Sequence, residues 1–199
     1  MELIPLGELI GYTAILGGSF DPVHCGHLHI ATQVLVKCPV TELHFVPCAK
    51  HPFKTDTLHL NYSERCRLLS CAIQAEPRFK LSRADENGSG FTSHMMQKLT
   101  RDYPSKHFAF IIGSDNLPSL HKWHDFPWLA ANLHFLILPR PDYSLDEANS
   151  LPIRCSILPI PLSPISSTDI RKRIVAGDSI KDLVPACIED DIIQLYGHR

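Results

Sequence analysis

Short apolar runs alternate with amphipathic stretches along the chain, and this alternation predicts the order of its elements. Most of the apolar runs end at a glycine or a proline, which is typical of buried strands. The stretches between them carry apolar positions three and four residues apart, which predicts helices. The predicted strands are residues 12–16, 43–46, 79–81, 108–112, 133–138 and 155–158. The predicted helices are residues 24–37, 62–74, 91–101, 168–175 and 185–196.

Strands and helices in alternation predict an α/β fold, a doubly wound and mainly parallel sheet of Rossmann-like architecture. A chain of 199 residues fits one domain, so we expect residues 1–199 to fold as a unit. The proline-rich stretch from Pro139 to Pro164 is expected to be a long surface connection. Ligands of such sheets bind beyond the carboxyl ends of the strands, so the residues after Leu16 and Ile112 are the first candidates for a site.

Composition narrows the class of protein. The formal net charge of -2 provides no basic field for a nucleic-acid backbone, so we expect no nucleic-acid partner. The 7 cysteines form no C-x-x-C pair, which argues against a zinc ribbon and favours reduced thiols in the cytoplasm. No apolar run approaches the ~18 residues that span a bilayer, and the N-terminus lacks the basic region of a signal peptide. We therefore expect a cytoplasmic protein with no membrane partner.

The turn after the first predicted strand gathers residue types that bind phosphate. It runs Gly17-Gly-Ser-Phe-Asp-Pro-Val-His-Cys-Gly-His27 and leads into a predicted helix. Gly17 and Gly18 allow the backbone to approach a ligand closely and to adopt a positive φ. His24 and His27 project onto one face of the helix start, and Gly26 leaves that face open. The N–H groups of a helix N-terminus add an anion site.

Three interpretations of this turn compete. The simplest is a glycine-rich turn with two solvated histidines, and it would suffice for any two of these residues alone. A metal site would use His24, His27 and His29 with Cys25, but His29 points elsewhere and no further ligand stands at helical spacing. Binding of nucleotide phosphates is favoured, because the strand, turn and helix follow one another as such a site requires.

A second stretch, Ile165-Ser-Ser-Thr-Asp-Ile-Arg171, begins another predicted helix. Serine and threonine are favourable N-cap residues, and Ile170 and Ile174 give the helix an apolar side. Arg171 lies near the helix start, where its guanidinium can add to an anion site. Alone, the stretch indicates a capped helix with a surface arginine. Together with the first turn, it favours a part in an anion site.

The two stretches resemble the H-x-G-H and I-S-S-T-x-I-R signatures of the nucleotidyltransferase superfamily. Further segments are similar to those of the bacterial nicotinate-nucleotide adenylyltransferase family. They are Pro47 with His51-Pro-Phe-Lys54, Arg67-Leu-Leu69, Phe110-Ile-Ile-Gly-Ser-Asp-Asn-Leu117, Lys122-Trp-His124 and Pro139-Arg-Pro141. The resemblance implies the nucleotidyltransferase fold. It also implies adenylyl transfer from ATP to nicotinate mononucleotide, giving nicotinate adenine dinucleotide and pyrophosphate in NAD biosynthesis.

The resemblance also implies roles for individual residues, with magnesium entering on ATP and no metal site built by the protein. The residues implied in catalysis are His24, His27, Lys54 and Arg171. Those implied in ATP binding are Gly17, Gly18, Ser19, Phe20, Gly26, Gly113, Asp115, Ser166, Ser167 and Thr168, with Asp115 on the ribose. Those implied in binding the nicotinate nucleotide are Thr92, Trp123 and Arg140. Without the resemblance, Trp123 would indicate a core or interface position and Thr92 a helix cap.

Other functions stay open from the sequence. The acceptor could be nicotinamide mononucleotide or phosphopantetheine in place of nicotinate mononucleotide. A nucleotide-binding sensor without catalysis would also keep the fold, although both signature histidines and Arg171 are present. Asp21 could form the turn or contact a ligand. The expected partners are ATP and nicotinate mononucleotide, and a homo-oligomer is compatible with the sequence.

Overall fold

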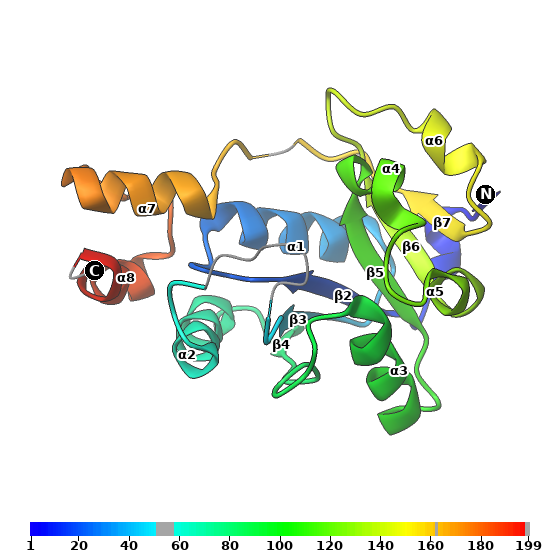
Figure 1. Cartoon of the computed structure of the whole chain (residues 1–199), viewed down its shortest axis with the longest axis horizontal. Coiled ribbons are helices and arrows are strands. Elements are labelled where there is room, and N and C mark those ends of the chain that lie inside the picture. Colours follow the sequence, from blue (N-terminus) through cyan, green and yellow to red (C-terminus); the bar gives the residue numbers. More distant parts are fainter. Residues whose placement is uncertain (51–57, 162, 198–199) are drawn as a thin grey trace.

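A sheet of parallel strands forms the centre of the molecule (Figure 1). The computed structural model describes residues 1–50, 58–161 and 163–197. Within these residues the sheet has seven strands in the order β1-β7-β6-β5-β2-β3-β4, and every neighbouring pair is parallel. The strands are β1 (Glu2–Leu3), β2 (Thr13–Gly18), β3 (Glu42–Pro47), β4 (Phe79–Leu81), β5 (Phe108–Gly113), β6 (His134–Leu138) and β7 (Arg154–Ile157).

Helices connect the strands and cover both faces of the sheet. The α-helices are α1 (Cys25–Lys37), α2 (Tyr62–Ile73), α3 (Thr92–Asp102), α4 (Leu117–Leu120), α5 (Phe126–Asn132), α6 (Asp146–Asn149), α7 (Ser167–Ala176) and α8 (Glu189–Gly197). The 3-10 helices are η1 (Leu6–Leu9), η2 (Ser114–Asn116) and η3 (Ala186–Ile188). Helix α2 begins at a capping box in which Asn61 and Glu64 exchange hydrogen bonds of 2.9 and 3.0 Å. Helix α7 ends at Gly177, whose φ of 75° suits a residue without a Cβ.

Side chains of successive strand residues enter two different cores, as the pleat of a strand requires. Ala14 and Leu16 of β2 pack with α1, α2, α7 and α8 in the first core. Ile15 lies between them in sequence and packs with α3 and α5 in the second core. Helices therefore pack against both faces of a parallel sheet, and the predicted doubly wound α/β fold is confirmed. Figure 1 shows α7 and α8 side by side at one end of the molecule, with the N-terminus at the other.

Each predicted strand and helix is present, but three parts of the fold differ from the prediction. The stretch from Pro139 to Pro164 is not an uninterrupted surface connection, since it holds α6 and buries Leu151 and Ile153. The last predicted helix is divided into η3 and α8, because the Ile188 N–H bonds the Pro185 carbonyl in a 3-10 turn. Strand β1 and the short helices α4 and α5 were not predicted. No described helix is long and apolar enough to cross a bilayer.

Candidate active site

Two cavities adjoin at the carboxyl ends of the central strands. The first, called the polar cavity here, has a volume of about 600 Å³ and lies between the first turn and the start of α7. The second, the apolar cavity, has a volume of about 360 Å³ and lies between the ends of β2, β3 and β5 and the start of α3. Ser19, His27, Ile30 and Arg140 line both. The site is therefore a pair of connected compartments with different chemistry.

The predicted residues divide between the two cavities. The polar cavity is lined by Ser19, Phe20, His24, Gly26, His27, Arg140, Ser166, Ser167, Thr168 and Arg171. The apolar cavity is lined by Gly17, Gly18, Ser19, His27, Thr92, Gly113, Trp123 and Arg140. Asp115 lines neither cavity. Lys54 lies outside the described residues, so its predicted role stays a prediction.

His24 and His27 lie against each other at the start of α1. Their rings stack with centroids 3.7 Å apart and planes 27° apart. The backbone N–H of His24 donates to Nδ1 of His27 over 3.3 Å. Because that nitrogen accepts a hydrogen bond, the neutral His27 ring carries its proton on Nε2. The arrangement leaves His27 one N–H donor for a ligand.

Burial favours the uncharged form of both rings. Burial lowers the pKa of His24 to about 4. Burial, and after it the neighbouring His24, hold the pKa of His27 well below its usual range. Nδ1 of His24 is buried and has no hydrogen-bond partner among the described residues. A bound anion would reverse part of this effect, since a negative charge favours the protonated ring.

Gly26 is required by the ring of His24. A Cβ at this position would lie 3.0 Å from Cε1 and from Nδ1 of His24, closer than side chains normally approach. The predicted open face at Gly26 is therefore occupied by the histidine ring that packs over it. A Cβ at this position would require the His24 ring to shift by a few tenths of an ångström.

The first turn adopts its positive φ at Phe20 and not at the glycines before it. The prediction of a positive φ at Gly17 and Gly18 is wrong, because both residues continue the extended strand β2, whereas their predicted part in ATP binding stays a prediction. Phe20 has φ 49°, and its buried ring meets the edge of His27 with centroids 4.9 Å apart. A Cβ on Gly18 would lie 3.2 Å from Cζ of Phe20. The glycine thus makes room for the aromatic ring that supports His27.

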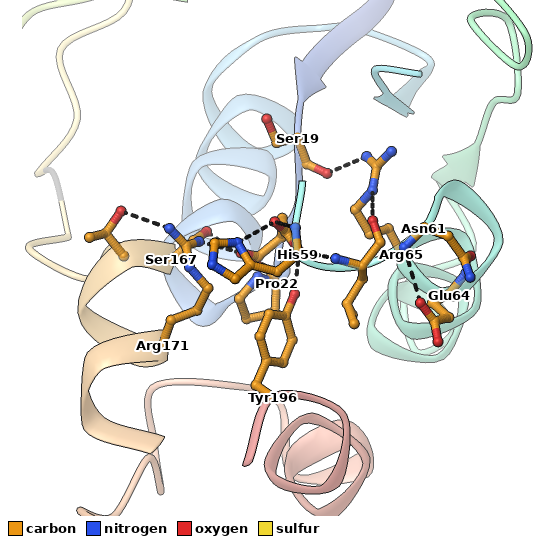
Figure 2. Close-up of polar contacts among 12 residues, drawn as sticks. Ser19, Pro22, His59, Asn61, Glu64, Arg65, Ser167, Arg171 and Tyr196 are labelled. Carbon is orange, nitrogen blue, oxygen red and sulfur yellow. Dashed lines mark hydrogen bonds and ion pairs between the residues drawn. The ribbon is translucent and has the colours of Figure 1, made fainter. Parts of the chain in front are cut away.

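Asp21 forms the turn. Its buried carboxylate accepts hydrogen bonds from the backbone N–H groups of His59 (2.7 Å) and Leu60 (3.1 Å). The hydroxyl of Tyr196, from α8, donates to the same carboxylate (Figure 2). With these donors the carboxylate is satisfied from within the protein. Of the two interpretations of Asp21, the structure favours the turn former, and it shows that the C-terminal helix helps to hold the turn.

Arg171 joins α7 to the first turn. Its Nη1 donates to the Asp21 carbonyl over 2.6 Å, and its Nη2 donates to Oγ1 of Thr168 over 3.2 Å. Ser167 adds a second link by donating from Oγ to the Pro22 carbonyl over 2.9 Å (Figure 2). A guanidinium has five N–H donors, so Arg171 keeps three for a ligand in the polar cavity.

The three hydroxyl groups at the start of α7 differ in what they can still donate. Oγ of Ser166 accepts the Asp169 N–H over 3.1 Å as the helix cap, which leaves its own hydrogen free. Thr168 likewise accepts from Arg171 and keeps its hydrogen. The hydrogen of Ser167 is directed at the Pro22 carbonyl. Ser166 and Thr168 are therefore the hydroxyl donors of this wall, and Ser167 is chiefly an anchor.

Arg65 is a buried residue that supports the site from outside both cavities, and the sequence patterns did not predict it. Its guanidinium donates to the Ser19 carbonyl over 2.6 Å, where β2 ends (Figure 2). It also donates to the Cys48 carbonyl over 2.9 Å, where β3 ends. The resemblance singled out Arg67, which instead forms an exposed ion pair with Asp191 over 2.6 Å. The spacing of Arg65 with the buried leucines three and four positions later could have placed it on the inner face of α2.

Aromatic side chains and a helix N-terminus shape the apolar cavity. Trp123 meets the edge of Phe110 with ring centroids 6.3 Å apart. Thr92 is the first residue of α3, and the N-cap residue Phe91 provides no side-chain hydrogen bond to the helix. The first N–H groups of α3 are thus left without a capping side chain beside the cavity. Both predicted residues, Thr92 and Trp123, line this cavity.

A buried carboxylate braces the loops around the apolar cavity. Asp85 accepts the backbone N–H groups of Ala49 over 2.7 Å and Gly90 over 3.3 Å. Burial raises the pKa of this carboxyl, and the hydrogen bonds oppose that effect. Asp85 therefore joins the end of β3 to the turn that leads into α3.

Gly113 gives space to an ion pair between Asp115 and Arg140. Nε of Arg140 lies 2.7 Å from Oδ1 of Asp115, and a Cβ on Gly113 would collide with both atoms. Oγ of Ser114 accepts the Arg140 N–H over 2.8 Å and fixes the start of this segment. Asp115 thus helps to position Arg140, which lines both cavities. Its predicted contact with a ribose stays a prediction.

Comparisons with known proteins show which family the chain resembles. Residues 15–173 match the model of the cytidylyltransferase-like family. A protein of Oceanobacillus iheyensis called probable nicotinate-nucleotide adenylyltransferase is 37% identical over 92% of this chain and 95% of its own. A protein of Porphyromonas gingivalis with the same name is 34% identical over 91% of this chain and 93% of its own.

The fold is also found among solved structures. The nicotinic acid mononucleotide adenylyltransferase of Plasmodium falciparum, complexed with NaAD, superposes with a TM-score of 0.79. The alignment covers 94% of this chain and 98% of that chain at 21% identity. At this identity the likeness supports the fold.

Proposed function

The chain belongs to the cytidylyltransferase-like family and, within it, to the nicotinate-nucleotide adenylyltransferases, and from this membership we propose how its residues act. The reaction transfers the adenylyl group of ATP to nicotinate mononucleotide and gives nicotinate adenine dinucleotide and pyrophosphate. An oxygen of the mononucleotide phosphate attacks the α-phosphorus of ATP. The bond from that phosphorus to the bridging oxygen breaks, and pyrophosphate leaves with the bonding electrons.

The observation that carries the proposal is the junction of the two cavities. A transfer between two bound nucleotides needs compartments that open onto one shared point. Ser19, His27 and Arg140 stand at that point, together with the apolar Ile30. We propose that the α-phosphate lies there, with the pyrophosphate group in the polar cavity and the nicotinate ring in the apolar cavity.

The walls of the polar cavity supply hydrogen-bond donors to the triphosphate from two sides. On one side are His24 and His27. On the other are Ser166, Thr168 and the unused N–H groups of Arg171. The donors are fixed before the substrate arrives, so they can stabilise charge on the departing pyrophosphate with little reorganisation. Arg171 supplies a permanent positive charge, and the two histidines begin as neutral donors.

The apolar cavity supports selection of the acid form of the pyridine ring. The ring would stack on Trp123, as an aromatic side chain in such a cavity permits. Its carboxylate would accept hydrogen bonds from the uncapped first N–H groups of α3 and from the hydroxyl of Thr92. A neutral amide presents N–H groups at one of the same positions, so the same donors would disfavour it.

Catalysis in this scheme consists of positioning and charge stabilisation. The attacking phosphate oxygen is already anionic, so no side chain has to act as the nucleophile. Magnesium bound to the triphosphate would neutralise part of its charge and is proposed to enter with ATP. Among the described residues no group of three histidine, cysteine or acidic side chains could hold a metal, and Asp21 is occupied by protein donors. Substrate oxygens and water therefore provide its proposed ligands.

Partners other than the two nucleotides stay predictions. We keep the expectation of a cytoplasmic enzyme without nucleic-acid or membrane partners, because its proposed substrates are small nucleotides. A homo-oligomer is compatible with the proposal.

The experiment that tests the proposal measures pyrophosphate release from ATP with each acceptor separately. Nicotinate mononucleotide should give equal amounts of pyrophosphate and dinucleotide, whereas nicotinamide mononucleotide and phosphopantetheine should give far less. Faster release with either of those acceptors would assign the chain a different substrate. Binding of ATP without release with any acceptor would support a nucleotide sensor.

A further inference from the structure

Two cysteines that are far apart in sequence face each other outside both cavities. Cys71 lies on α2 and Cys187 lies in η3, 116 positions later. Sγ of Cys71 donates to the Cys187 carbonyl over 3.6 Å, and Sγ of Cys187 donates to the Cys71 carbonyl over 3.5 Å. These reciprocal contacts place each sulfur against the backbone of the other residue. No other pair of cysteines in the described chain makes such contacts.

The two thiols are accessible to a reagent in solution. Cys187 is exposed and Cys71 is half-buried, whereas Cys38, Cys66 and Cys155 are buried in the cores. Burial, and after it the neighbouring Cys71, raises the pKa of Cys187. Each sulfur lies against the backbone carbonyl of the other cysteine, and closure of a disulfide requires the two sulfur atoms to turn toward each other.

We propose that Cys71 and Cys187 form a dithiol modification site that a peroxide closes to a disulfide. The Cys71 thiol loses its proton, its sulfur attacks one peroxide oxygen, and the O–O bond breaks; a sulfenic acid forms, and the departing hydroxide takes up a proton and becomes water. The Cys187 sulfur then attacks the sulfenic sulfur, the S–O bond breaks, and a second water leaves as the disulfide forms. Two thiols are oxidised, one peroxide is reduced, and a thiol reductant reverses the modification.

The disulfide would link α2 to the segment formed by η3 and α8, and both elements make hydrogen bonds to the first turn. Helix α2 carries Arg65, which donates to the Ser19 carbonyl. Segment η3 leads directly into α8, which carries Tyr196 and its hydrogen bond to Asp21. A disulfide over this long a loop removes conformations from the unfolded chain and stabilises the native one. Because neither cysteine lines the polar or the apolar cavity, the crosslink should leave adenylyl transfer unchanged.

Peroxide treatment of the full-length enzyme tests the proposal. After treatment, titration should show two thiols fewer than in the reduced protein. Trypsin cleaves after Arg67 and Arg78 and after Lys181, so the expected linked peptides are residues 68–78 and 182–199, each with one cysteine. The oxidised enzyme should unfold at a temperature several degrees higher, and dithiothreitol should reverse the shift.

Single variants provide the controls. Cys71→Ser and Cys187→Ser should each abolish the linked peptide and the thermal shift. Because Cys187 is exposed, its replacement by serine should leave the protein folded even if Cys71→Ser folds poorly. Cys155→Ala removes a distant buried thiol and should preserve both signals. Three results would overturn the proposal. The first is that all thiols survive a peroxide concentration that is sufficient to oxidise dithiothreitol. The others are a disulfide between different cysteines and a disulfide between two chains.

Discussion

Replacing Arg171 by lysine tests whether a guanidinium at the start of α7 binds the triphosphate. Two of the N–H groups of Arg171 are engaged with the Asp21 carbonyl and Thr168, which leaves three for phosphate oxygens. A lysine ammonium has only three donors in all and no planar fork. If it keeps the two protein contacts, it offers a single donor to the substrate. The charge is preserved, so the variant isolates the loss of directed hydrogen bonds.

The expected loss of kcat/KM follows from the number of hydrogen-bond donors that the lysine lacks. A hydrogen bond to a charged group contributes about 1.5–3 kcal/mol. Loss of one such bond to the triphosphate in the transition state should lower kcat/KM for ATP about 10- to 150-fold. Loss of both extra donors would lower it further. The free energy of unfolding should change less, because Arg171 is half-buried and its charge remains.

Arg173→Lys is a matched control for this measurement. It makes the same chemical change on the same helix, at an exposed residue whose Nε lies 3.1 Å from Oδ2 of Asp169. Initial rates of pyrophosphate release over a range of ATP concentrations give kcat/KM for both variants, and thermal unfolding verifies that both are folded. Arg173→Lys should stay within about twofold of the native enzyme. Equal losses in the two variants would mean that a diffuse field, and not a directed contact, binds the phosphates.

Three further changes test other parts of the site. His27→Ala should lower kcat about 10²-fold or more with a smaller effect on ATP binding, and unchanged turnover would contradict its place at the junction. Trp123→Ala should raise KM for nicotinate mononucleotide about tenfold and spare KM for ATP, and equal effects on both would refute the stacking role. Burial, and after it Arg154, lower the pKa of His134 to about 4, so its contribution to stability is present above the unfolded pKa of about 6.5 and is lost as pH falls toward 4. Urea unfolding should show that the free energy of unfolding falls by up to about 3 kcal/mol in the native protein as the pH is lowered, and by less in His134→Asn. If the free energy of unfolding of the two proteins depended on pH in the same way, this role of His134 would be contradicted.

Local patterns predicted the parts of the site that lie on single segments. The turn from Gly17 to His27 and the stretch from Ile165 to Arg171 each carry their own strand, cap or helix signals. Parallel strands place their carboxyl ends at one edge of a sheet, so the meeting of these two stretches also followed from the fold class. The family resemblance added Thr92 and Trp123, which no local pattern distinguishes from ordinary core or cap residues.

The contacts that hold these segments together could not be predicted in the same way. Arg65 is explained by two carbonyls that converge only when β2 and β3 pair. The hydroxyl of Tyr196 donates to Asp21, 175 positions away in sequence, and neither residue type by itself predicts this contact. The positive φ at Phe20 depends on the space that Gly18 leaves for its ring. Each of these features arises from tertiary packing, which local sequence patterns do not predict.

Competition between two acceptors in one reaction measures whether the apolar cavity selects nicotinate mononucleotide for adenylyl transfer. The native enzyme receives ATP and equal amounts of nicotinate and nicotinamide mononucleotides, and the ratio of the two dinucleotide products gives the ratio of kcat/KM. Buried donors left unpaired cost about 1–3 kcal/mol each, so two of them at the start of α3 predict a preference of about 100-fold or more for the nicotinate product. Nearly equal amounts of the two products would contradict the donor-lined pocket and make the enzyme a dual-specificity adenylyltransferase.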